Sequence, residues 1–356
     1  MELISAGGSF ACEVRDHALW ETRNDTDVAA IRMAYRDHGV LVFRRQALSE
    51  EDLLAFGKSM GEPSIYAETH WLSTVPEVII LSNMRDQDGE MLGGLANKPL
   101  TWHTDQSYYA EPVTGCFLYG VELPSEGGAT RWASLYEAYG TLPANLKNIV
   151  DGGVATFSYR ARSAQAQKAD DNHDWETRLR ETPDVKHPLV NVSPATGRRA
   201  LFIDPGTVTG IDGLPQDEAD DVLAALMHHV IQPSNVYEHE WAPGDLVMWD
   251  NMCTLHARTW FDPSQSRVLR RTTVAGKAPD ICKCTGTFAP FRIIAAVLIK
   301  MFPDRHLTRD YPHLRKFSEG RAGSVRKKIV LLFLAPTKTT NDTPQKIFII
   351  ITNVCR

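Results

Sequence analysis

The chain has 356 residues and a formal net charge of −6, and hydrophobic and charged residues make up 43% and 23% of it. These values are typical of a water-soluble globular protein with one large domain or two ordinary ones. No apolar run is long enough to cross a bilayer, and the sequence shows no signal peptide. The six cysteines lack the spacing of a zinc finger or a disulfide framework, so we expect free thiols and a cytoplasmic protein.

The charge is unevenly distributed along the chain. Residues 281–356 carry 14 Lys and Arg against 4 Asp and Glu, a balance of +10, whereas residues 1–280 have a balance of −16. This shift predicts a domain over residues 1–280 and a basic C-terminal extension over residues 281–356. Three apolar segments of the extension favour an amphipathic helix or edge strands: residues 288–300, 329–334 and 347–351. We expect the simpler alternative, a poorly ordered extension.

Short elements alternate along the first 280 residues. Apolar periodicity, capping residues and terminal glycines predict helices over residues 28–38, 49–61, 134–139, 143–150 and 217–231. Apolar or alternating runs predict strands over residues 40–43, 78–82, 116–123, 129–132, 187–192, 199–203, 244–251 and 268–274. The glycine-rich residues 86–99 indicate a mobile loop, either a lid or an ordinary surface connection, and the charged residues 161–180 indicate an exposed insertion.

The order of these elements predicts the fold class. Strands and helices do not alternate, which argues against a nucleotide-binding α/β fold. Many short strands closed by helices predict a mainly β protein with flanking helices. The expected core is a double-stranded β-helix, or jelly roll.

The segment Trp102–Tyr108 contains a His and an Asp two residues apart. If the segment is a strand or the end of one, His103 and Asp105 share a face and can converge on one metal ion. His256, which follows a later strand and turn, offers a third ligand. Two histidines and one carboxylate suit non-haem Fe(II), whereas participation of the nearby Cys253 would favour zinc. A hydrogen-bonded histidine at a sheet edge is the alternative for the first pair.

Three arginines follow His256 in the last predicted strand. Arg267 and Arg271 are an even number of residues apart and share a face, while Arg270 points away. Two inward guanidinium groups beside a metal would bind anions, because their shape matches a carboxylate. A basic edge strand with all three side chains in water is the equal alternative.

Four linked motifs resemble the taurine / 2,4-dichlorophenoxyacetate dioxygenase family over roughly residues 25–277. In order, they are Trp102-His103-Thr104-Asp105, Pro124-x-x-Gly127-Gly128-x-Thr130, Gly244-Asp245-Leu246-x-x-Trp249-Asp250-Asn251-x-x-x-x-His256 and Arg267-x-x-x-Arg271. Their order and intervals make the resemblance specific.

The resemblance implies a metal site and a co-substrate site. The ligands of Fe(II) would be His103, Asp105 and His256. The co-substrate 2-oxoglutarate would chelate the iron and extend its distal carboxylate to Thr130 and Arg267, with O2 as the other substrate. Arg271 would be the catalytic-site residue that faces the acidic group of the primary substrate. The reaction would release succinate and CO2.

The resemblance also bears on the kind of substrate. Halogenating relatives lack a carboxylate where this chain keeps Asp105, which favours hydroxylation or another oxygen-derived outcome. Residues 61–66 lack the histidine of taurine enzymes, which favours a carboxylate substrate, including an aromatic one, over a sulfonate. Candidates for the pocket wall are Tyr66, Gln106, Tyr108, Phe157 and Phe202, with core packing as the alternative for the aromatic ones.

We therefore expect a 2-oxoglutarate-dependent non-haem iron dioxygenase that oxidises a small, carboxylate-bearing molecule. We expect no nucleic-acid partner and no membrane span, and the resemblance favours a homo-oligomer. Two other functions use the same residues. One is a non-catalytic regulatory protein that binds 2-oxoglutarate or metal and interacts through the basic extension, and the other is a zinc hydrolase.

Overall fold

The computed structural model describes residues 1–7, 10–19, 25–65, 73–94, 100–166, 175–279, 329–332 and 350–353. The chain divides into two compact units, Met1–Gly286 and Thr287–Arg356. In the second unit, β17 (Ile329–Leu332) pairs antiparallel with β18 (Ile350–Asn353). These strands overlap two segments of the extension that were predicted to be β-prone. The amphipathic helix predicted over residues 288–300 lies outside the described residues.

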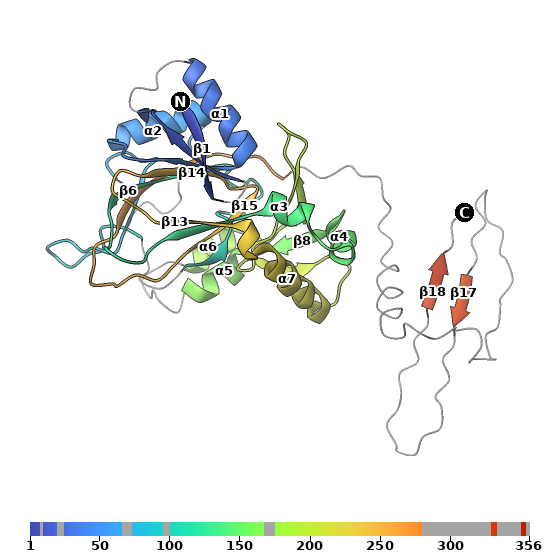
Figure 1. Ribbon diagram of the computed structural model, residues 1–356. Coiled ribbons are helices and arrows are strands. Elements are labelled where there is room, and N and C mark those ends of the chain that lie inside the picture. Colours follow the sequence, from blue (N-terminus) through green and yellow to red (C-terminus); the bar gives the residue numbers. More distant parts are fainter. Residues whose placement is uncertain are drawn as a thin grey trace. The chain divides into compact units, whose positions relative to one another are not determined.

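Two sheets form the centre of the first unit (Figure 1). The larger sheet has seven strands, in the spatial order β1 (Glu2–Gly7), β2 (Ala11–Arg15), β3 (Val40–Phe43), β14 (Leu246–Asp250), β6 (Gly115–Glu122), β16 (Val268–Val274) and β4 (Ile79–Ser82). The smaller sheet has four, in the order β13 (Val236–His239), β7 (Thr130–Ser134), β15 (Thr254–Arg258) and β5 (Leu100–His103). Neighbouring strands in these sheets are antiparallel except β2 and β3, which are parallel.

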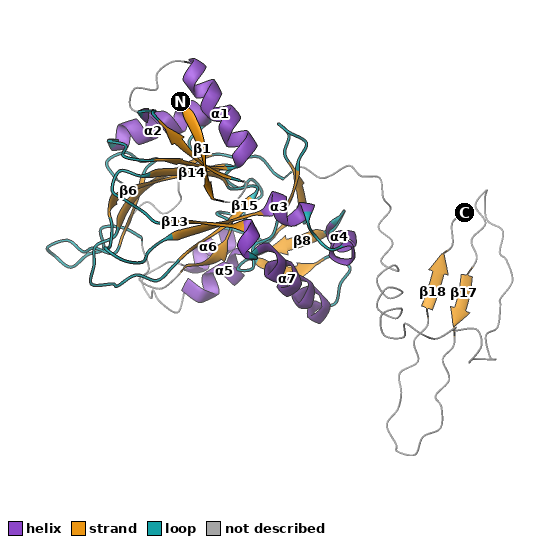
Figure 2. Ribbon diagram, viewed as in Figure 1, coloured by secondary structure: helices purple, strands orange, loops and turns teal. Residues whose placement is uncertain are grey.

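Short sheets and helices surround this centre (Figure 2). The short strands are β12 (Val208–Ile211), β8 (Val154–Phe157) and β9 (Val185–Pro188) in one sheet, and β10 (Val190–Val192) and β11 (Arg199–Leu201) in another. The helices are α1 (Asp25–His38), α2 (Glu50–Met60), α3 (Leu135–Gly140), α4 (Ala144–Val150), α5 (Tyr159–Ala166), α6 (Trp175–Glu181), α7 (Gln216–Val230) and the 3-10 helix η3 (Pro233–Asn235). Helices α1 and α2 pack against the larger sheet, whereas α3 and α7 pack beside β11 and β12.

The central strands of the larger sheet, β3, β14 and most of β6, are buried on both faces, which explains their apolar residues. Along β3, Leu41 packs in a cluster with side chains of α1 and α2, whereas Val40 packs in a cluster with the smaller sheet. Met248 and Trp249 of β14 divide between the same two clusters. The space between the sheets is filled by large rings, since Trp132 and Trp249 lie with their centroids 5.5 Å apart. Alternate side chains of each strand therefore build two separate cores.

The register of β16 decides which arginines face the space between the sheets. Arg271 is paired with Leu118, which belongs to the core between the sheets, whereas Arg270 is paired with Tyr119, which belongs to the helix side. Arg267 and Arg271 are only 2% and 8% exposed. Of the two alternatives for these arginines, the structure has the one in which Arg267 and Arg271 are buried and Arg270 lies on the other face.

Most predicted elements are present, and Ser49 and Asp52 form the capping box of α2. Two predictions need correction. Residues 161–180, predicted to be an exposed insertion, contribute to α5 and α6 where they are described, and Tyr159 and Ser163 of α5 are buried. The buried face begins before the charged stretch, so the stretch itself shows no apolar period. The strand predicted over residues 187–192 is interrupted at Leu189, because β9 and β10 belong to different sheets.

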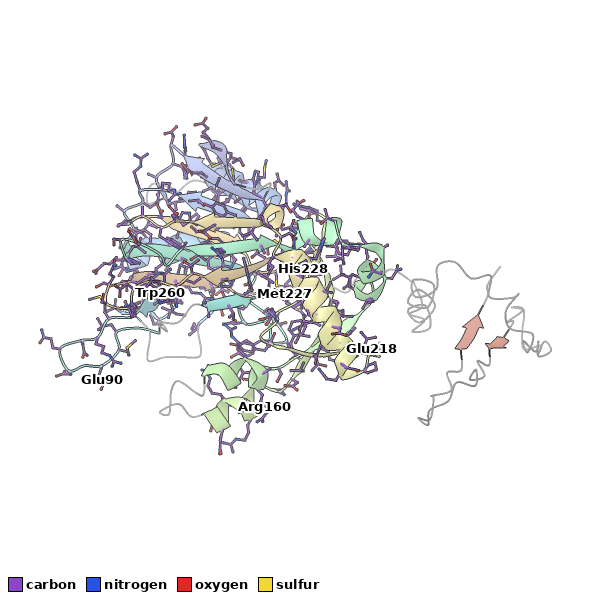
Figure 3. All side chains as sticks on the ribbon, turned by 60° about the horizontal axis from the view of Figure 1, so that its bottom comes forward. Glu90, Arg160, Glu218, Met227, His228 and Trp260 are labelled. Carbon is purple, nitrogen blue, oxygen red and sulfur yellow. The ribbon has the colours of Figure 1, made fainter. Side chains whose placement is uncertain are left out.

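Within the described helices, none is long and apolar enough to cross a membrane. The described part of the glycine-rich loop, residues 86–94, folds into a turn in which Asp86 Oδ1 accepts bonds from the backbone N–H groups of Asp88 and Glu90. Figure 3 shows Glu90 extending away from the sheets at this loop. The mobility of the loop and its role as a lid stay predictions.

Gly244 closes the turn before β14 with a φ of 85°, and a Cβ there would lie 2.7 Å from Gln46 O. Gly213 has a φ of 83° with nothing within 4 Å of its Cβ position. We expect Gly244→Ala to lower the free energy of unfolding by about 3 kcal/mol and Gly213→Ala by about 1 kcal/mol, because only the former adds a backbone clash to a left-handed conformation. Chemical denaturation measures both values. Equal decreases in the free energy of unfolding for the two variants would show that the backbone relieves the clash between residue 244 and Gln46 O.

Candidate metal centre

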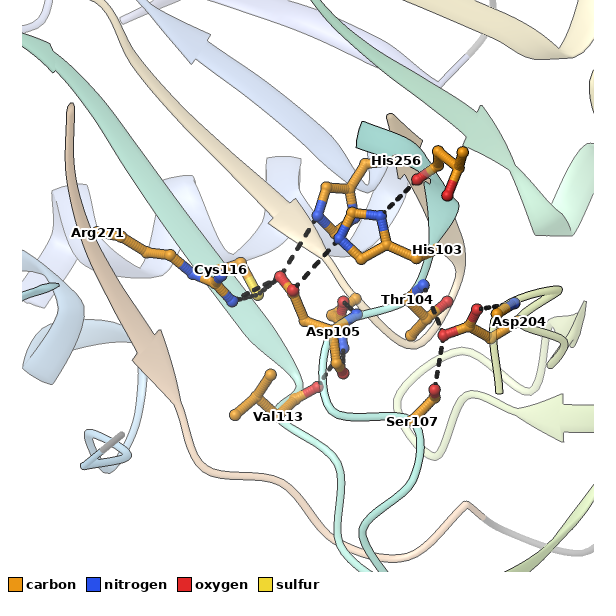
Figure 4. A network of polar contacts seen from close by, with 12 residues as sticks. His103, Thr104, Asp105, Ser107, Val113, Cys116, Asp204, His256 and Arg271 are labelled. Atoms are coloured by element: carbon orange, nitrogen blue, oxygen red, sulfur yellow. Dashed lines mark hydrogen bonds and ion pairs between the residues drawn. The ribbon is translucent and has the colours of Figure 1, made fainter. Parts of the chain in front are cut away.

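Two histidines and one aspartate meet between the main sheets (Figure 4). His103 ends β5 and is paired with His256 of β15, so their ring centroids lie 4.0 Å apart. Asp105 follows β5, and a turn rather than the strand pleat brings its carboxylate to the rings. Its Oδ1 is 3.7 Å from Nε2 of His103, and its Oδ2 is 3.5 Å from Nε2 of His256. These three buried residues, called the triad below, place one ligand atom each within 4.8 Å of the others.

Both imidazoles of the triad are neutral at pH 7. Burial lowers the pKa of His256 to about 4 and lowers the pKa of His103 well below its usual value. Nδ1 of His103 lies 2.8 Å from Thr101 O. A carbonyl oxygen only accepts, so Nδ1 is assigned the hydrogen and Nε2 keeps its lone pair on the side of Asp105. Neutral rings are the state that metal coordination requires.

Asp105 is held by the larger sheet through its backbone and its side chain. Asn251, just after β14, accepts a bond from Asp105 N at 3.0 Å and donates one to Asp105 O at 2.8 Å. Arg271 Nη2 donates to Asp105 Oδ2 at 2.6 Å, and Cys116 Sγ donates to the same oxygen at 3.4 Å. Burial raises the pKa of Asp105, but its surroundings, above all the positive charge of Arg271, lower it below the usual value. The carboxylate is therefore ionised and fixed in place.

Arg271 was expected to face the acidic group of a substrate. Its guanidinium instead bonds to Asp105 and lies 3.9 Å from Cys116 Sγ. The arginine therefore neutralises the carboxylate of the triad in this structure. Its contact with a substrate stays a prediction.

A second buried guanidinium lies just before β16. Arg267 Nη2 donates to Gly128 O at 3.2 Å, while Arg267 Nε is buried with no hydrogen-bond partner in the described part of the chain. The guanidinium groups of Arg267 and Arg258 pack 5.8 Å and 5.1 Å from the ring of Phe261. Burial, and then the charge of Arg258, lower the pKa of Arg267 to about 9, so the side chain stays protonated at pH 7. An anion would stabilise such a buried cation.

Thr130 begins β7, two residues after Gly128. Its Oγ1 accepts a bond from Trp241 Nε1 at 2.9 Å, which leaves the hydroxyl hydrogen to be donated elsewhere. A Cβ at Gly128 would lie 3.1 Å from Arg267 Nε, so a residue without a side chain leaves room for the arginine. Gly128, Thr130 and Arg267 are called the arginine corner below.

A buried aspartate supports the turn that carries Asp105. Asp204 Oδ2 accepts bonds from Ser107 Oγ at 2.7 Å and from Thr104 N at 3.3 Å. Its Oδ1 accepts a bond from Gly206 N at 2.8 Å. Burial raises the pKa of Asp204, and the positive charge of Arg162, followed by these hydrogen bonds, opposes that rise. The turn after β5 is therefore tied to a neighbouring turn rather than to solvent.

The residues predicted to line a pocket lie in three different settings. Gln106, with a φ of 55°, and Tyr108 are half-buried in the turn that follows the triad aspartate. Phe157 and Phe202 are 0% exposed and pack against each other with centroids 5.4 Å apart. Tyr66 lies outside the described residues. Their contact with a substrate stays a prediction.

Sequence reasoning missed three residues that hold the triad: Asn251, Cys116 and Asp204. Asn251 lies inside one of the motifs, where its amide was the available signal. Cys116 and Asp204 carry no local signal, because strand register and the docking of two turns create their contacts. Cys253, the alternative zinc ligand, is absent from the group of converging ligand atoms, and its Sγ donates to Asp250 O at 3.5 Å.

Comparisons with known proteins agree with this geometry. The family model described as "Taurine catabolism dioxygenase TauD, TfdA family" matches residues 6–273. The chain is 33% identical over 283 residues to the alpha-ketoglutarate-dependent 2,4-dichlorophenoxyacetate dioxygenase of Cupriavidus pinatubonensis, which covers 76% of this chain and 96% of that protein. It is 34% identical over 269 residues to the pentalenolactone F synthase of Streptomyces avermitilis, which covers 70% of this chain and 86% of that protein.

The fold is similar to the crystal structure of a taurine dioxygenase from Burkholderia xenovorans, with a TM-score of 0.63 and 28% identity, over 78% of this chain and 92% of that one. Sequence and fold thus agree over the unit that contains the triad. The chain therefore belongs to the TauD/TfdA family of dioxygenases.

Proposed function

We propose that the chain uses Fe(II) bound by the triad and 2-oxoglutarate bound at the arginine corner to hydroxylate a small organic acid. The family gives the enzyme class, a 2-oxoglutarate-dependent non-haem iron dioxygenase. We propose the roles of the individual residues, hydroxylation as the reaction, and an organic acid as the substrate. The convergence of three ligand atoms beside the buried Arg271, with Arg267 buried four residues earlier in the chain, is the observation that carries it.

The triad fits iron better than zinc. Two neutral imidazole nitrogens and one ionised carboxylate supply three ligands and leave positions open for other molecules. A structural zinc ion prefers four ligands, usually including thiolates. Burial raises the pKa of Cys116 and of Cys253 well above the usual value, so both stay thiols, which coordinate metal poorly. Iron bound by the triad would supply the redox chemistry for oxygen activation and oxidative decarboxylation to succinate and CO2.

The arginine corner fits the distal carboxylate of 2-oxoglutarate. Arg267 Nε is a buried donor without a partner, and the hydroxyl of Thr130 has a hydrogen to donate. A carboxylate bound there would satisfy both donors and offset the burial of the guanidinium. The residues around Asp105 would orient its carboxylate toward the metal and balance the charge of the site.

The surrounding residues balance charge and hold the ligand in place. The co-substrate is a dianion and Asp105 adds a third negative charge, so a divalent cation alone does not neutralise the site. Arg267 and Arg271 supply the missing positive charge in a buried setting, where such pairing is strong. Asn251 keeps the backbone of Asp105 from turning its carboxylate away from the imidazoles.

Three further parts of the proposal have separate support. Asp105 occupies the ligand position that halogenation would need, which supports hydroxylation. The relative named for 2,4-dichlorophenoxyacetate acts on a carboxylate, which supports an acid substrate here. The facing of a seven-stranded and a four-stranded sheet supports a jelly-roll core over residues 1–280. A regulatory binding protein would need no turnover, and the family membership favours the enzyme.

Replacement of His103 tests the metal site. Under nitrogen, addition of Fe(II) and then 2-oxoglutarate to the wild-type protein should give a weak visible absorption band, and exposure to air should give succinate. We expect His103→Ala to abolish both signals, because one of three ligands is lost. The control is His228→Ala, since His228 is exposed on α7 (Figure 3). An undiminished band in His103→Ala would disprove the assignment.

Replacement of Arg267 tests the arginine corner. We expect Arg267→Lys to raise the KM for 2-oxoglutarate about 30-fold, because a lysine cannot reproduce the position of the Nε donor and its neighbours. Arg270→Lys makes the same change three residues away on the helix side of the sheet and should leave the KM within about twofold. Steady-state succinate formation measures both constants. Similar effects of the two variants would contradict the co-substrate site.

Replacement of Asn251 tests how Asp105 is positioned. We expect Asn251→Ala to weaken Fe(II) binding about tenfold and to lower the free energy of unfolding by about 2 kcal/mol, because Asp105 and Val113 lose backbone partners. Asn148→Ala, on the exposed side of α4, is the matched control and should change neither value. Anaerobic metal titration and chemical denaturation give the two numbers. Wild-type iron affinity in Asn251→Ala would rule out the positioning role.

A further inference from the structure

Trp241, which follows β13, is bonded to the arginine corner. Its Nε1 donates to Thr130 Oγ1 at 2.9 Å. An indole N–H only donates, so the hydroxyl hydrogen of Thr130 cannot point back at Trp241. Among the residues that the structure describes, Thr130 Oγ1 makes no other hydrogen bond. The bond from Trp241 therefore fills one acceptor site of the hydroxyl and leaves its hydrogen available for a bound molecule.

Strand pairing brings Trp241 next to Thr130. His239 of β13 is paired with Thr130 of β7, and Trp241 comes two residues later. The rings of His239 and Trp241 meet edge to face with centroids 4.7 Å apart. A Cβ at Gly120 of β6 would lie 3.3 Å from the indole, so a residue without a side chain leaves room for the ring. The indole thus contacts both main sheets.

A buried carboxylate fixes the turn that carries this indole. Asp245 Oδ2 accepts bonds from Ala242 N at 2.9 Å and from His239 Nε2 at 3.1 Å, which lie on either side of Trp241 in sequence. Arg44 Nη1 donates to the same oxygen at 2.6 Å. Burial raises the pKa of Asp245, but the bond from His239, followed by the bond from Ala242 N and the charge of Arg44, lowers it below the usual value. The carboxylate is therefore ionised and holds the chain on both sides of Trp241.

Thr130 and Arg267 are connected through two neighbouring residues. Arg258 of β15 is paired with Thr130, and the guanidinium groups of Arg258 and Arg267 both pack on the ring of Phe261. Arg267 Nε is buried with no hydrogen-bond partner in the described part of the chain. Arginine side chains have no acceptor, so these residues offer donors to a bound group. A carboxylate, which only accepts, suits such donors better than an uncharged apolar end does.

We propose that Trp241 is a positioning residue for the distal carboxylate of the co-substrate, because its bond to Thr130 Oγ1 directs the hydroxyl hydrogen toward that carboxylate. This inference rests on the proposed function, since it takes the arginine corner as the co-substrate site. Trp241 then affects only those 2-oxo acids that carry a second carboxylate. A 2-oxo acid without one binds through its metal-chelating end alone and does not depend on Trp241.

Equilibrium binding to the full-length protein tests the role of Trp241. The protein is loaded with Fe(II) under nitrogen, and calorimetry follows 2-oxoglutarate and 2-oxopentanoate, which has the same chain length but no distal carboxylate. We expect Trp241→Phe, which keeps an aromatic ring but removes the N–H, to weaken binding of 2-oxoglutarate about tenfold. Its affinity for 2-oxopentanoate should stay within about twofold of the wild-type value, and the visible band should be unchanged.

Replacement of Thr130 tests whether Trp241 acts through the hydroxyl. Thr130→Val should also weaken binding of 2-oxoglutarate about tenfold. Adding Trp241→Phe to this variant should change the affinity by less than about twofold, because the bond between the two side chains is already lost. Trp260→Phe is the matched control, since it makes the same ring replacement at an exposed position (Figure 3) and should bind both acids like the wild-type protein.

Three results would overturn the proposal: Trp241→Phe binds 2-oxoglutarate like the wild-type protein, it weakens both acids alike, or its effect persists in full in Thr130→Val. A wild-type protein that gives no visible band with 2-oxoglutarate would overturn the proposed function as well. A normal band and tighter wild-type binding of 2-oxoglutarate than of 2-oxopentanoate, with unaltered binding in Trp241→Phe, would overturn only the role of Trp241.

Discussion

The bonds between Asn251 and Asp105 join the two main sheets at the metal centre. Asn251 follows a strand of the larger sheet and Asp105 follows a strand of the smaller one, so each bond also connects two layers. Arg271 adds a charged contact from the larger sheet, while both imidazoles come from the smaller sheet. The ligand set is therefore complete only when the sheets face each other in one register, which makes assembly of the site part of the packing of the core.

Burial makes the balance of charge in this space decisive. Asp105 and Arg271 compensate each other directly, and loss of either would leave an unpaired charge between the sheets. Arg267 lies in a different setting, since burial and then the positive charge of Arg258 lower its pKa. The arginine corner therefore contains a buried guanidinium that is positively charged at pH 7. A dianionic co-substrate is the kind of ligand that such a site stabilises.

Local sequence patterns predicted those elements whose signals are themselves local. The helix over residues 28–38, the strand Val40–Phe43 and the capping box at Ser49 depend on propensity, periodicity and one side-chain bond, and all three are present. Strands such as β8 and β13 have four residues each, too few for a period to be seen, and they lack the unbroken apolar run of Val40–Phe43. The parallel pairing of β2 with β3 depends on the tertiary structure and cannot be seen in the sequence of either strand. The buried face of α5 was missed because it begins at Tyr159, outside the charged stretch.

The site shows the same contrast: its ligand residues could be predicted from local sequence, whereas the contacts between distant segments could not. His103, Asp105 and His256 were candidates because metal chemistry demands those residue types, and the structure brings them together. The alternation of side chains along a strand put Arg271 on the same face as Arg267. The turn after β5 brings Asp105 within hydrogen-bond distance of Arg271, which the sequence pattern does not show. Arg162 lies over the turn of Asp204 and Gly206 because α5 docks there, which its own segment does not encode. The turn that carries the triad aspartate is likewise joined to the turn of Asp204 by bonds from Thr104 N and Ser107 Oγ, which no local pattern encodes.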